Sequence, residues 1–368
     1  MIFDSESVFE ENVITVLKQH GWKDGVLRYP TERDLLDNWK DILYRNNNDI
    51  DRLGKYPLTD GEMTQIIEQI ETLRTPLALN SFVNGRTVSI TRDNKEDVAH
   101  FGKEVSLYIY DRKEIAGGKS TYQIAQQPVY PAKNKMLNSR RGDLVLLING
   151  MPLIHIELKK SGIPVSQATN QIEKYAHEGV FTGLFRLVQI FVAMNPDDAV
   201  YFANPGVDKF NPSYYFHWAD YNNEPICGGQ NPGKDEWKLF IGGTSGTAGL
   251  LSIPMAHQLI GFYTIADSAD GCLKVLRSYQ YIAANAISDV VRKCDWEQRP
   301  ATPGRPGGYV WHTTGSGKTM TSFKSAQLIA DSHDADKVVF LMDRIELGTQ
   351  SLKEYRSFAD SETRSEEH

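Results

Sequence analysis

The segment RGDLVLLINGMPLIHIELKKSG, residues 141–162, restricts most strongly how this chain can fold. Two apolar runs flank Asn149-Gly150, a dipeptide typical of a tight turn between antiparallel strands, so we predict a buried β-hairpin. Charged residues nevertheless stand in and beside these strands, at Asp143, Glu157 and Lys159. Burying charge is costly unless the charge is paired or binds a metal. The hairpin is therefore a candidate chemical site.

Length and composition limit the class of protein. The chain has 368 residues, of which 40% are hydrophobic and 24% charged, which is typical of a soluble globular protein with two domains. No apolar run approaches the roughly 20 residues of a membrane span, and the acidic N-terminus lacks a basic leader. The cysteines 227, 272 and 294 have no spacing suited to zinc or disulfides. We therefore expect a cytoplasmic protein that does not associate with membranes.

The net charge of -7 does not by itself indicate a nucleic-acid partner, but a groove can be locally basic. Basic residues do gather around the hairpin, at Lys133, Lys135, Arg140, Arg141, Lys159 and Lys160. This cluster is consistent with DNA binding or with a solvated loop, and charge alone does not decide between them.

The order of expected elements indicates an α/β fold with a boundary past the middle of the chain. Apolar spacing predicts helices over about 6–20 and 60–74, and strand-like runs follow at 86–91, 104–111, 122–130 and 184–195. The stretch 204–249 is rich in Pro, Gly, Asn and aromatic residues, and its end, IGGTSGTAG, is the best boundary candidate. We predict domains over 1–245 and 246–368.

The second domain begins with the pattern of a parallel doubly wound sheet. A helical run over 273–294 precedes a short strand at 309–313, a glycine loop, a helix, and a buried strand at 337–343. The loop HTTGSGKT, residues 312–319, is typical of a phosphate cradle, in which backbone N–H groups and a helix N-terminus bind nucleotide phosphates. Lys318 would bind the β- and γ-phosphates of ATP, and Thr319 would hold magnesium. The loop residues that we predict to bind nucleotide are Thr314, Gly315, Ser316, Gly317, Lys318 and Thr319.

The charges of the hairpin are suited to metal-dependent chemistry. Two neighbouring carboxylates bind a hard divalent cation, and an adjacent lysine can orient or help deprotonate the water that the metal activates. Glu157 and Lys159 lie two positions apart, so both side chains leave the same face of a strand. We therefore predict Asp143, Glu157 and Lys159 as catalytic residues, with Asp143 and Glu157 as ligands of Mg²⁺.

This prediction requires an irregular hairpin. A regular two-residue turn would pair Asp143 with Ile156 and place Asp143 and Glu157 on opposite faces. Pro152 cannot donate a ladder hydrogen bond, so we expect a bulge or a three-residue connection near it.

Two helices are expected beside this hairpin. SQATNQIEKYAHEG, residues 166–179, places Gln167, Gln171 and Tyr175 at successive i, i+4 positions, as one polar stripe. Without the Glu-Leu-Lys motif, a solvated helix face would be the better interpretation of the stripe. Glu6 and Glu10 share one face of the first helix and are candidates for a further carboxylate near the metal.

Three of these motifs resemble known families. HTTGSGKT, with His312 in place of the first glycine of the general pattern, resembles superfamily 2 helicases and translocases. Asp143 with Glu-Leu-Lys at 157–159 resembles the PD-(D/E)XK nucleases. Gln171 and Tyr175 are similar to the Q-x-x-x-Y element of the RecB-like nucleases of that group, which implies a role in positioning DNA.

The helicase resemblance implies further roles. Gln280 in LRSYQ would read adenine, although Ser278 stands where a proline is common. Arg344 and Gln350 in MDRIELGTQ would contact the DNA backbone.

The motifs in this order resemble the motor and nuclease (R) subunit of type I restriction enzymes, over nearly the whole chain and most strongly at 140–180 and 305–350. The resemblance implies a PD-(D/E)XK domain followed by the start of a RecA-like helicase domain. It also implies ATP-driven translocation of double-stranded DNA, Mg²⁺-dependent cleavage away from the recognition site, and methyltransferase (M) and specificity (S) subunits as partners. The acidic magnesium motif, the second RecA-like domain and the arginine finger of a full motor are missing, so we expect a truncated chain that binds nucleotide weakly without turnover.

Two alternatives remain. One is a RecB-like nuclease-helicase of another defence or repair system, which would lack methyltransferase partners. The other is a non-catalytic module that docks DNA or other subunits, but such a module has no need for two carboxylates and a lysine on apolar strands.

Overall fold

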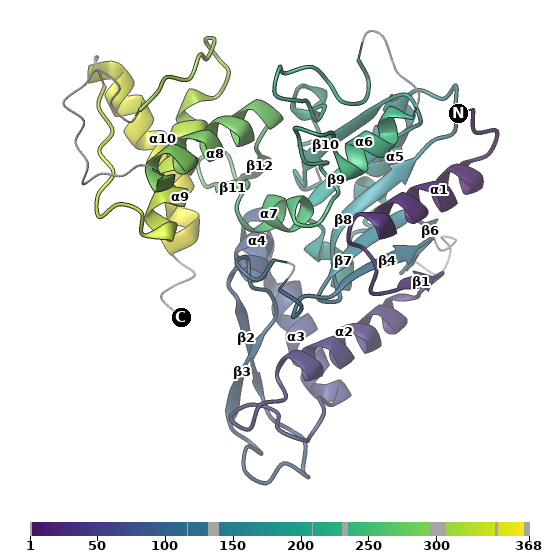
Figure 1. Cartoon of the computed structure of the whole chain (residues 1–368). Coiled ribbons are helices and arrows are strands. Elements are labelled where there is room, and N and C mark those ends of the chain that lie inside the picture. The colour runs from purple at the N-terminus through teal and green to yellow at the C-terminus, as the bar shows by residue number, and fades with distance from the viewer. Residues whose placement is uncertain are drawn as a thin grey trace.

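A six-stranded mixed sheet forms the centre of the first part of the chain. The computed structural model, shown in Figure 1, describes residues 2–115, 117–131, 140–207, 209–229, 235–293, 307–342 and 345–363. The strand order is β1-β4-β7-β8-β9-β10, and the pairs β1/β4 and β8/β9 are parallel while the others are antiparallel. The strands are β1 (Val26–Arg28), β4 (Tyr122–Gln126), β7 (Leu144–Ile148), β8 (Met151–Leu158), β9 (Ile190–Met194) and β10 (Ala199–Ala203).

The predicted hairpin and its irregularity are both confirmed. Asn149 and Gly150 connect β7 to β8 with φ of 53° and 84°, as expected for an Asn-Gly turn of type I′. Leu147 pairs with Pro152 and Leu146 pairs with Ile154, so that Leu153 is an extra residue and forms a bulge. Beyond the bulge Leu144 pairs with Ile156, which brings Asp143 opposite Glu157 on one face.

The two faces of the sheet are covered by different helices. The even-numbered residues of β8 and β9, such as Ile156 and Val192, belong to the same core cluster as Phe9 of α1 (Glu6–Gln19). The odd-numbered residues Phe191 and Ala193 pack instead with Ala168 and Ile172 of α5 (Val165–Glu178). Both helices match the predicted ranges. Because both faces are buried, the strands are apolar throughout instead of alternating.

A helical layer with a β-ribbon extends below the sheet in Figure 1. It consists of α2 (Glu32–Asn46), α3 (Asp60–Thr72), α4 (Pro76–Asn84), β2 (Thr87–Thr91) and β3 (Glu104–Tyr108). The helices α2 and α3 both begin with capping boxes, at Thr31 and Thr59, which satisfy otherwise free backbone N–H groups. Arg92 is buried and paired with Glu62 of α3 at 2.7 Å and with Asp97 at 3.1 Å, so each of these buried charges has a partner.

The second part of the chain contains mainly helices. Its elements are α6 (Glu236–Gly242), α7 (Met255–Gly261), β11 (Thr264–Asp267), β12 (Cys272–Val275), α8 (Ser278–Lys293), α9 (Lys318–Ser332) and α10 (Ile345–Thr363). Figure 1 shows α8, α9 and α10 gathered beside one another, away from the sheet. α7 packs against the first part, where His257 Nδ1 lies 2.9 Å from Tyr122 Oη. The domain boundary at 245 remains a prediction.

Three predicted elements of the second part differ from the structure. The predicted helix over 273–294 is confirmed from Ser278 to Lys293, but residues 272–275 form β12, paired with β11. Residues 309–313 and 337–342 form no strand, and Trp311 and Leu341 are about nine-tenths exposed. A strand needs a neighbour that accepts its backbone hydrogen bonds, and within the described part of the chain neither segment has one.

Some predictions concern residues without a described structure. Lys133, Lys135, Cys294 and Arg344 lie outside the described residues. Among the helices that are described, none is both long and apolar enough to span a membrane.

Candidate functional site

The two predicted carboxylates meet at the end of β8. The backbone N–H of Leu158 donates a hydrogen bond of 2.7 Å to Asp143 Oδ2, which ties the start of β7 to the residue after Glu157. The Glu157 side chain is fully buried. The structure therefore brings together the two carboxylates that the sequence analysis proposed as a pair, and the bulge at Leu153 makes this possible.

Burial makes both groups reluctant to ionise. It raises the pKa of Asp143 to about 8, and repulsion from the Glu157 carboxylate adds to this rise. It also raises the pKa of Glu157 to about 7, although the Lys159 ammonium opposes the change. Two buried acids that resist losing their protons are expected where a cation normally supplies the missing charge.

Lys159 completes the predicted trio. Its Nζ lies 3.4 Å from Glu157 Oε1 and donates a hydrogen bond of 2.8 Å to the carbonyl oxygen of Leu158. It also lies 3.7 Å from Oε1 of Glu6, on α1. The lysine is thus held beside the carboxylates by contacts on two elements.

Glu10 of α1 also lies at this site. It is buried, and Gln126 Nε2 donates a hydrogen bond of 2.6 Å to its Oε1. Burial raises the pKa of Glu10, and the Asp143 carboxylate contributes to the rise. The helix α1 therefore contributes two carboxylates to the site. Glu6 lies near Lys159, and Glu10 is close enough to Asp143 for their charges to repel.

The oxygen atoms at this site fit a hard divalent cation with few protein ligands. No cluster of three or more His, Cys, Asp or Glu side chains with metal-binding geometry is present in the described ranges. The Glu157 carboxylate is fully buried, and its repulsion of the Asp143 carboxylate contributes to the raised pKa of Asp143. Mg²⁺ is commonly held by one or two carboxylates and keeps several waters. Asp143 and Glu157 match that donor set.

The helix α5 holds the segment that leads into Asp143. Gln171 Nε2 donates to Tyr175 Oη at 2.7 Å, and Tyr175 Oη donates to the carbonyl of Arg141 at 2.9 Å. Burial raises the pKa of Tyr175 to about 12, so its hydroxyl stays protonated. The hydroxyl is therefore used to anchor the backbone next to Asp143, while Gln167 is exposed.

The glycine loop lies at the start of α9, as predicted. Gly317 adopts the left-handed conformation with φ of 77°, and a Cβ there would collide with the Gln280 side chain, so glycine is required. Lys318 Nζ donates to the carbonyl of Thr313 at 3.1 Å, and His312 Nδ1 lies 2.8 Å from Ser316 Oγ. The loop is thus folded back on its own backbone.

Gln280 lies beside this loop, as the sequence analysis expected, but it is buried. Its Oε1 accepts a hydrogen bond from the Arg277 N–H at 2.9 Å, and its Nε2 donates to the Gly317 carbonyl at 3.2 Å. In this arrangement the amide supports the loop. Gln350 lies elsewhere, exposed on α10, where it donates to Glu354.

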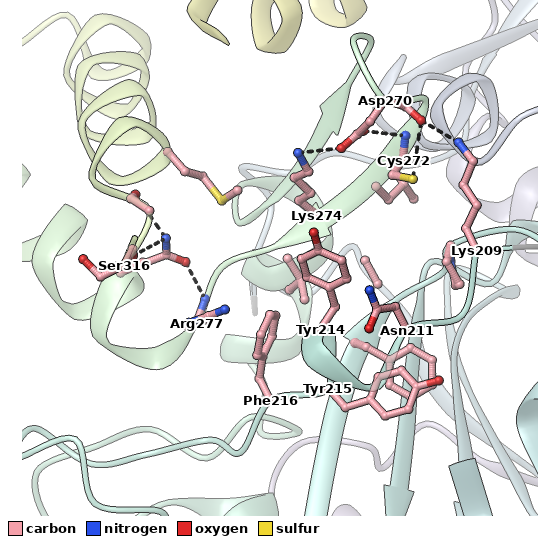
Figure 2. A pocket seen from close by; sticks show the side chains of 18 of the residues that line it. Lys209, Asn211, Tyr214, Tyr215, Phe216, Asp270, Cys272, Lys274, Arg277 and Ser316 are labelled. Atoms are coloured by element: carbon pink, nitrogen blue, oxygen red, sulfur yellow. Dashed lines mark hydrogen bonds and ion pairs between the residues drawn. The ribbon is translucent and has the colours of Figure 1, made fainter. Parts of the chain in front are cut away.

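A cavity of about 250 Å³ opens next to the loop (Figure 2). Its lining includes Tyr214, Tyr215 and Phe216, together with Arg277, Gln280 and the loop residues Gly315–Gly317. The Arg277 guanidinium lies 4.4 Å from the centre of the Phe216 ring, an arrangement typical of a cation–π contact. The cavity thus joins residues of both predicted domains.

Comparisons with known proteins match both parts of the chain to families. Residues 4–210 match the family described as type I restriction enzyme R protein N terminus, and residues 279–368 match the SWI2/SNF2 ATPase family. The chain belongs to the type I restriction enzyme R proteins.

Relatives of the R-protein family cover nearly the whole chain. A type I restriction enzyme endonuclease subunit of Staphylococcus saprophyticus is 31% identical over 367 residues, which is 98% of this chain and 34% of the relative. A Staphylococcus aureus subunit is 32% identical over 361 residues, with the same two coverages. An Escherichia coli subunit is 29% identical over 217 residues, 57% of this chain and 62% of that protein. The chain spans about a third of the length of the staphylococcal relatives.

Two residues of this candidate site escaped the sequence analysis. His155 and Tyr130 are both buried, His155 Nε2 lies 3.4 Å from Glu157 Oε2, and the Tyr130 hydroxyl lies 2.8 Å from His155 Nδ1. The signal was present in the sequence, because His155 is a polar residue two positions before Glu157 on a strand that is otherwise apolar. The strand period of two therefore places it on the face of the carboxylates.

Proposed function

We propose that this chain carries the nuclease site and the ATP-binding loop of a type I restriction enzyme R subunit. In this proposal, residues 1–245 form a PD-(D/E)XK endonuclease domain, and residues 246–368 are the first part of a RecA-like superfamily 2 motor domain. The complete enzyme would move double-stranded DNA with ATP and cleave it away from the recognition site. Its M and S subunits would supply methylation and sequence recognition.

The observation that carries the nuclease proposal is the bulged hairpin. Only the extra residue Leu153 turns Glu157 to the face of Asp143, and it leaves Lys159 Nζ 3.4 Å from Glu157 Oε1. A hairpin that served packing alone would not need two acids and a lysine in this arrangement. Coverage of 98% of the chain by R-protein relatives favours this function over a RecB-like system.

Each residue has a distinct task in the proposed reaction. A Mg²⁺ ion, when bound, would polarise a phosphodiester oxygen and lower the pKa of a water molecule. Asp143 and Glu157 would hold it, and both must first lose the protons that burial favours. Lys159 would orient the attacking water, or accept its proton when the side chain is in the neutral amine form. None of these groups distinguishes one base from another, so sequence specificity would come from another subunit.

The glycine loop would hold ATP. The N–H groups of Thr314, Gly315, Ser316 and Gly317 would bind its phosphates, together with Lys318, while Thr319 would bind its magnesium ion. For this to happen, Lys318 has to leave the Thr313 carbonyl, to which it now donates. The aromatic cavity beside Gln280 offers space for the base. Gln171 and Tyr175 would position DNA through the segment before Asp143, and Arg344 and Gln350 would contact its backbone.

A nicking assay tests the nuclease proposal. Supercoiled plasmid is incubated with the chain and Mg²⁺ without ATP, and nicked plasmid is measured over time. We expect cleavage by the wild type and by the Lys95→Ala variant, which changes an exposed lysine outside the basic cluster, but none by the Glu157→Ala, Lys159→Ala double variant.

Metal binding provides a second measurement of the same site. Electron paramagnetic resonance counts the Mn²⁺ ions bound to the wild type and to the Glu157→Ala variant. Cleavage by the double variant at the wild-type rate would contradict the proposal, as would a wild type that neither cleaves nor binds Mn²⁺.

Nucleotide binding tests the second site. We expect a fluorescent ATP analogue to bind weakly to the wild type and to the Lys337→Ala control, and not to the Lys318→Ala variant. Equal binding to all three proteins would show that the loop is not a nucleotide site.

A further inference from the structure

His155 is enclosed in the sheet beside the proposed metal ligand. It is fully buried on β8, and its ring is surrounded by the rings of Tyr130, Tyr175, Phe181 and Phe191. An imidazole in such surroundings needs partners for both ring nitrogens, because an unsatisfied buried polar atom is costly.

One ring nitrogen has a clear partner. Nδ1 lies 2.8 Å from the hydroxyl of Tyr130. Tyr130 is itself buried, and burial raises its pKa, so that the hydroxyl keeps its proton. The two side chains approach closely beside Gly142, where any Cβ would come within 2.5 Å of the Tyr130 oxygen and 2.9 Å of His155 Cε1. Glycine next to Asp143 is therefore needed for the Tyr130–His155 pair.

The other ring nitrogen faces the carboxylate. His155 Nε2 lies 3.4 Å from Glu157 Oε2. Among the residues with described structure, both atoms are buried and lack a hydrogen bond of good geometry. A Tyr130 hydroxyl that donates to Nδ1 leaves the ring N–H on Nε2, and both nitrogens then face complementary groups.

We propose that His155, fixed by Tyr130, is a positioning residue that holds Glu157 by an Nε2–H bond to Oε2 and so directs Oε1 toward Lys159 and the metal. This inference rests on the proposed nuclease site and adds a second layer to it. Partners that hold metal ligands in this way typically change metal affinity or activity by roughly 10- to 100-fold when they are removed.

The ring tautomer is a direct readout that does not depend on metal or activity. Long-range ¹H–¹⁵N spectra of the metal-free chain distinguish Nε2–H from Nδ1–H, and the His155→Gln variant identifies the signal. We expect the Nε2–H form in the wild type, and a mixture of both tautomers in the Tyr130→Phe variant, which loses only the hydroxyl. An Nδ1–H form in the wild type would overturn the proposal.

The affinity for Mn²⁺ measures how the loss of the His155 donor affects the proposed metal site. The His155→Leu variant keeps a buried side chain of similar size but has no donor, and we expect at least a roughly tenfold weaker Mn²⁺ affinity. In the His155→Gln variant an amide N–H takes the place of Nε2–H and should restore affinity to within about threefold of wild type. Melting temperatures of both variants in EDTA separate this effect from a loss of folding.

The outcomes also separate this inference from the proposed function. If the Asp143→Asn variant binds Mn²⁺ as well as the wild type, the metal site is wrong, and the role of His155 is refuted with it. If Asp143→Asn weakens Mn²⁺ binding while a stably folded His155→Leu variant binds normally, only the role of His155 is refuted.

Discussion

Replacing Asp143 with asparagine should stabilise the metal-free protein, with a strong dependence on pH. Burial raises the pKa of Asp143 from 3.8 to about 8. An acid whose pKa is raised by folding stabilises the fold below its unfolded value, and this contribution is lost as the pH rises through about 8. The amide side chain that the Asp143→Asn variant carries cannot ionise, and its oxygen can still accept the Leu158 N–H.

The expected gain in stability can be calculated from the shift in the pKa of Asp143. At about 1.4 kcal/mol for each tenfold change in proton affinity, ionised Asp143 would cost the fold at most roughly 5 to 6 kcal/mol. Relaxation and water entry reduce such costs in real proteins, so we expect about 2 to 4 kcal/mol at pH 9. At roughly 2 to 4 °C per kcal/mol for a domain of this size, the Asp143→Asn variant should melt about 5 to 15 °C higher than the wild type.

Thermal melts followed by circular dichroism at pH 5 and pH 9, both in EDTA, measure this difference. At pH 5 the acid is protonated in the folded wild type and most of the ionisation cost is absent, so the two proteins should melt within a few degrees of one another. Asp51→Asn, which changes an exposed acid, serves as control and should behave like wild type at both pH values. A difference between Asp143→Asn and wild type that is the same at both pH values would refute the reasoning, as would a variant that is less stable at pH 9.

Three further changes test the hairpin and its support. Gly150→Ala places a Cβ 2.8 Å from Trp39 Cα at a φ of 84°; we expect a loss of about 1 to 3 kcal/mol in urea unfolding, and an unchanged midpoint would contradict the tight approach. Tyr175→Phe keeps the ring but loses the bond to the Arg141 carbonyl, which should cost about 1 kcal/mol and slow plasmid nicking; nicking at the wild-type rate would exclude an anchoring role. Deleting Leu153 should turn Glu157 to the opposite face and abolish Mn²⁺ binding while nucleotide binding at the glycine loop persists, so that retained Mn²⁺ affinity would show that the bulge is dispensable.

The hairpin was predictable because its determinants are local. The Asn149-Gly150 turn specifies its own backbone conformation, and Pro152 indicates where the ladder is interrupted. Once the face of Glu157 was required to match that of Asp143, a bulge was the only consistent solution with a two-residue turn. The helices α1 and α5 were predicted for the same reason, since apolar spacing within one segment defines each of them.

The predictions that failed depend on distant partners. Residues 273–275 were assigned to a helix because LKVL fits either period, and their pairing with β11 decides in favour of a strand. Residues 309–313 and 337–342 have strand-like composition, but strand formation needs a neighbouring strand, which the described residues do not supply. Tyr130 could not be linked to His155 from sequence, because the two residues meet only through the folded sheet.

Apolar side chains on segments without strand pairing also influence how a protein behaves in solution. Tyr309, Trp311, Val339 and Leu341 are each at least 85% exposed, and they lie on backbone that pairs with no described strand. Exposed backbone of this kind is a template for strands from other molecules. Self-association should therefore rise with protein concentration, and it should be relieved by charged substitutions at these positions. Dilution series are thus the natural way to separate the intrinsic activity of one molecule from the behaviour of its aggregates.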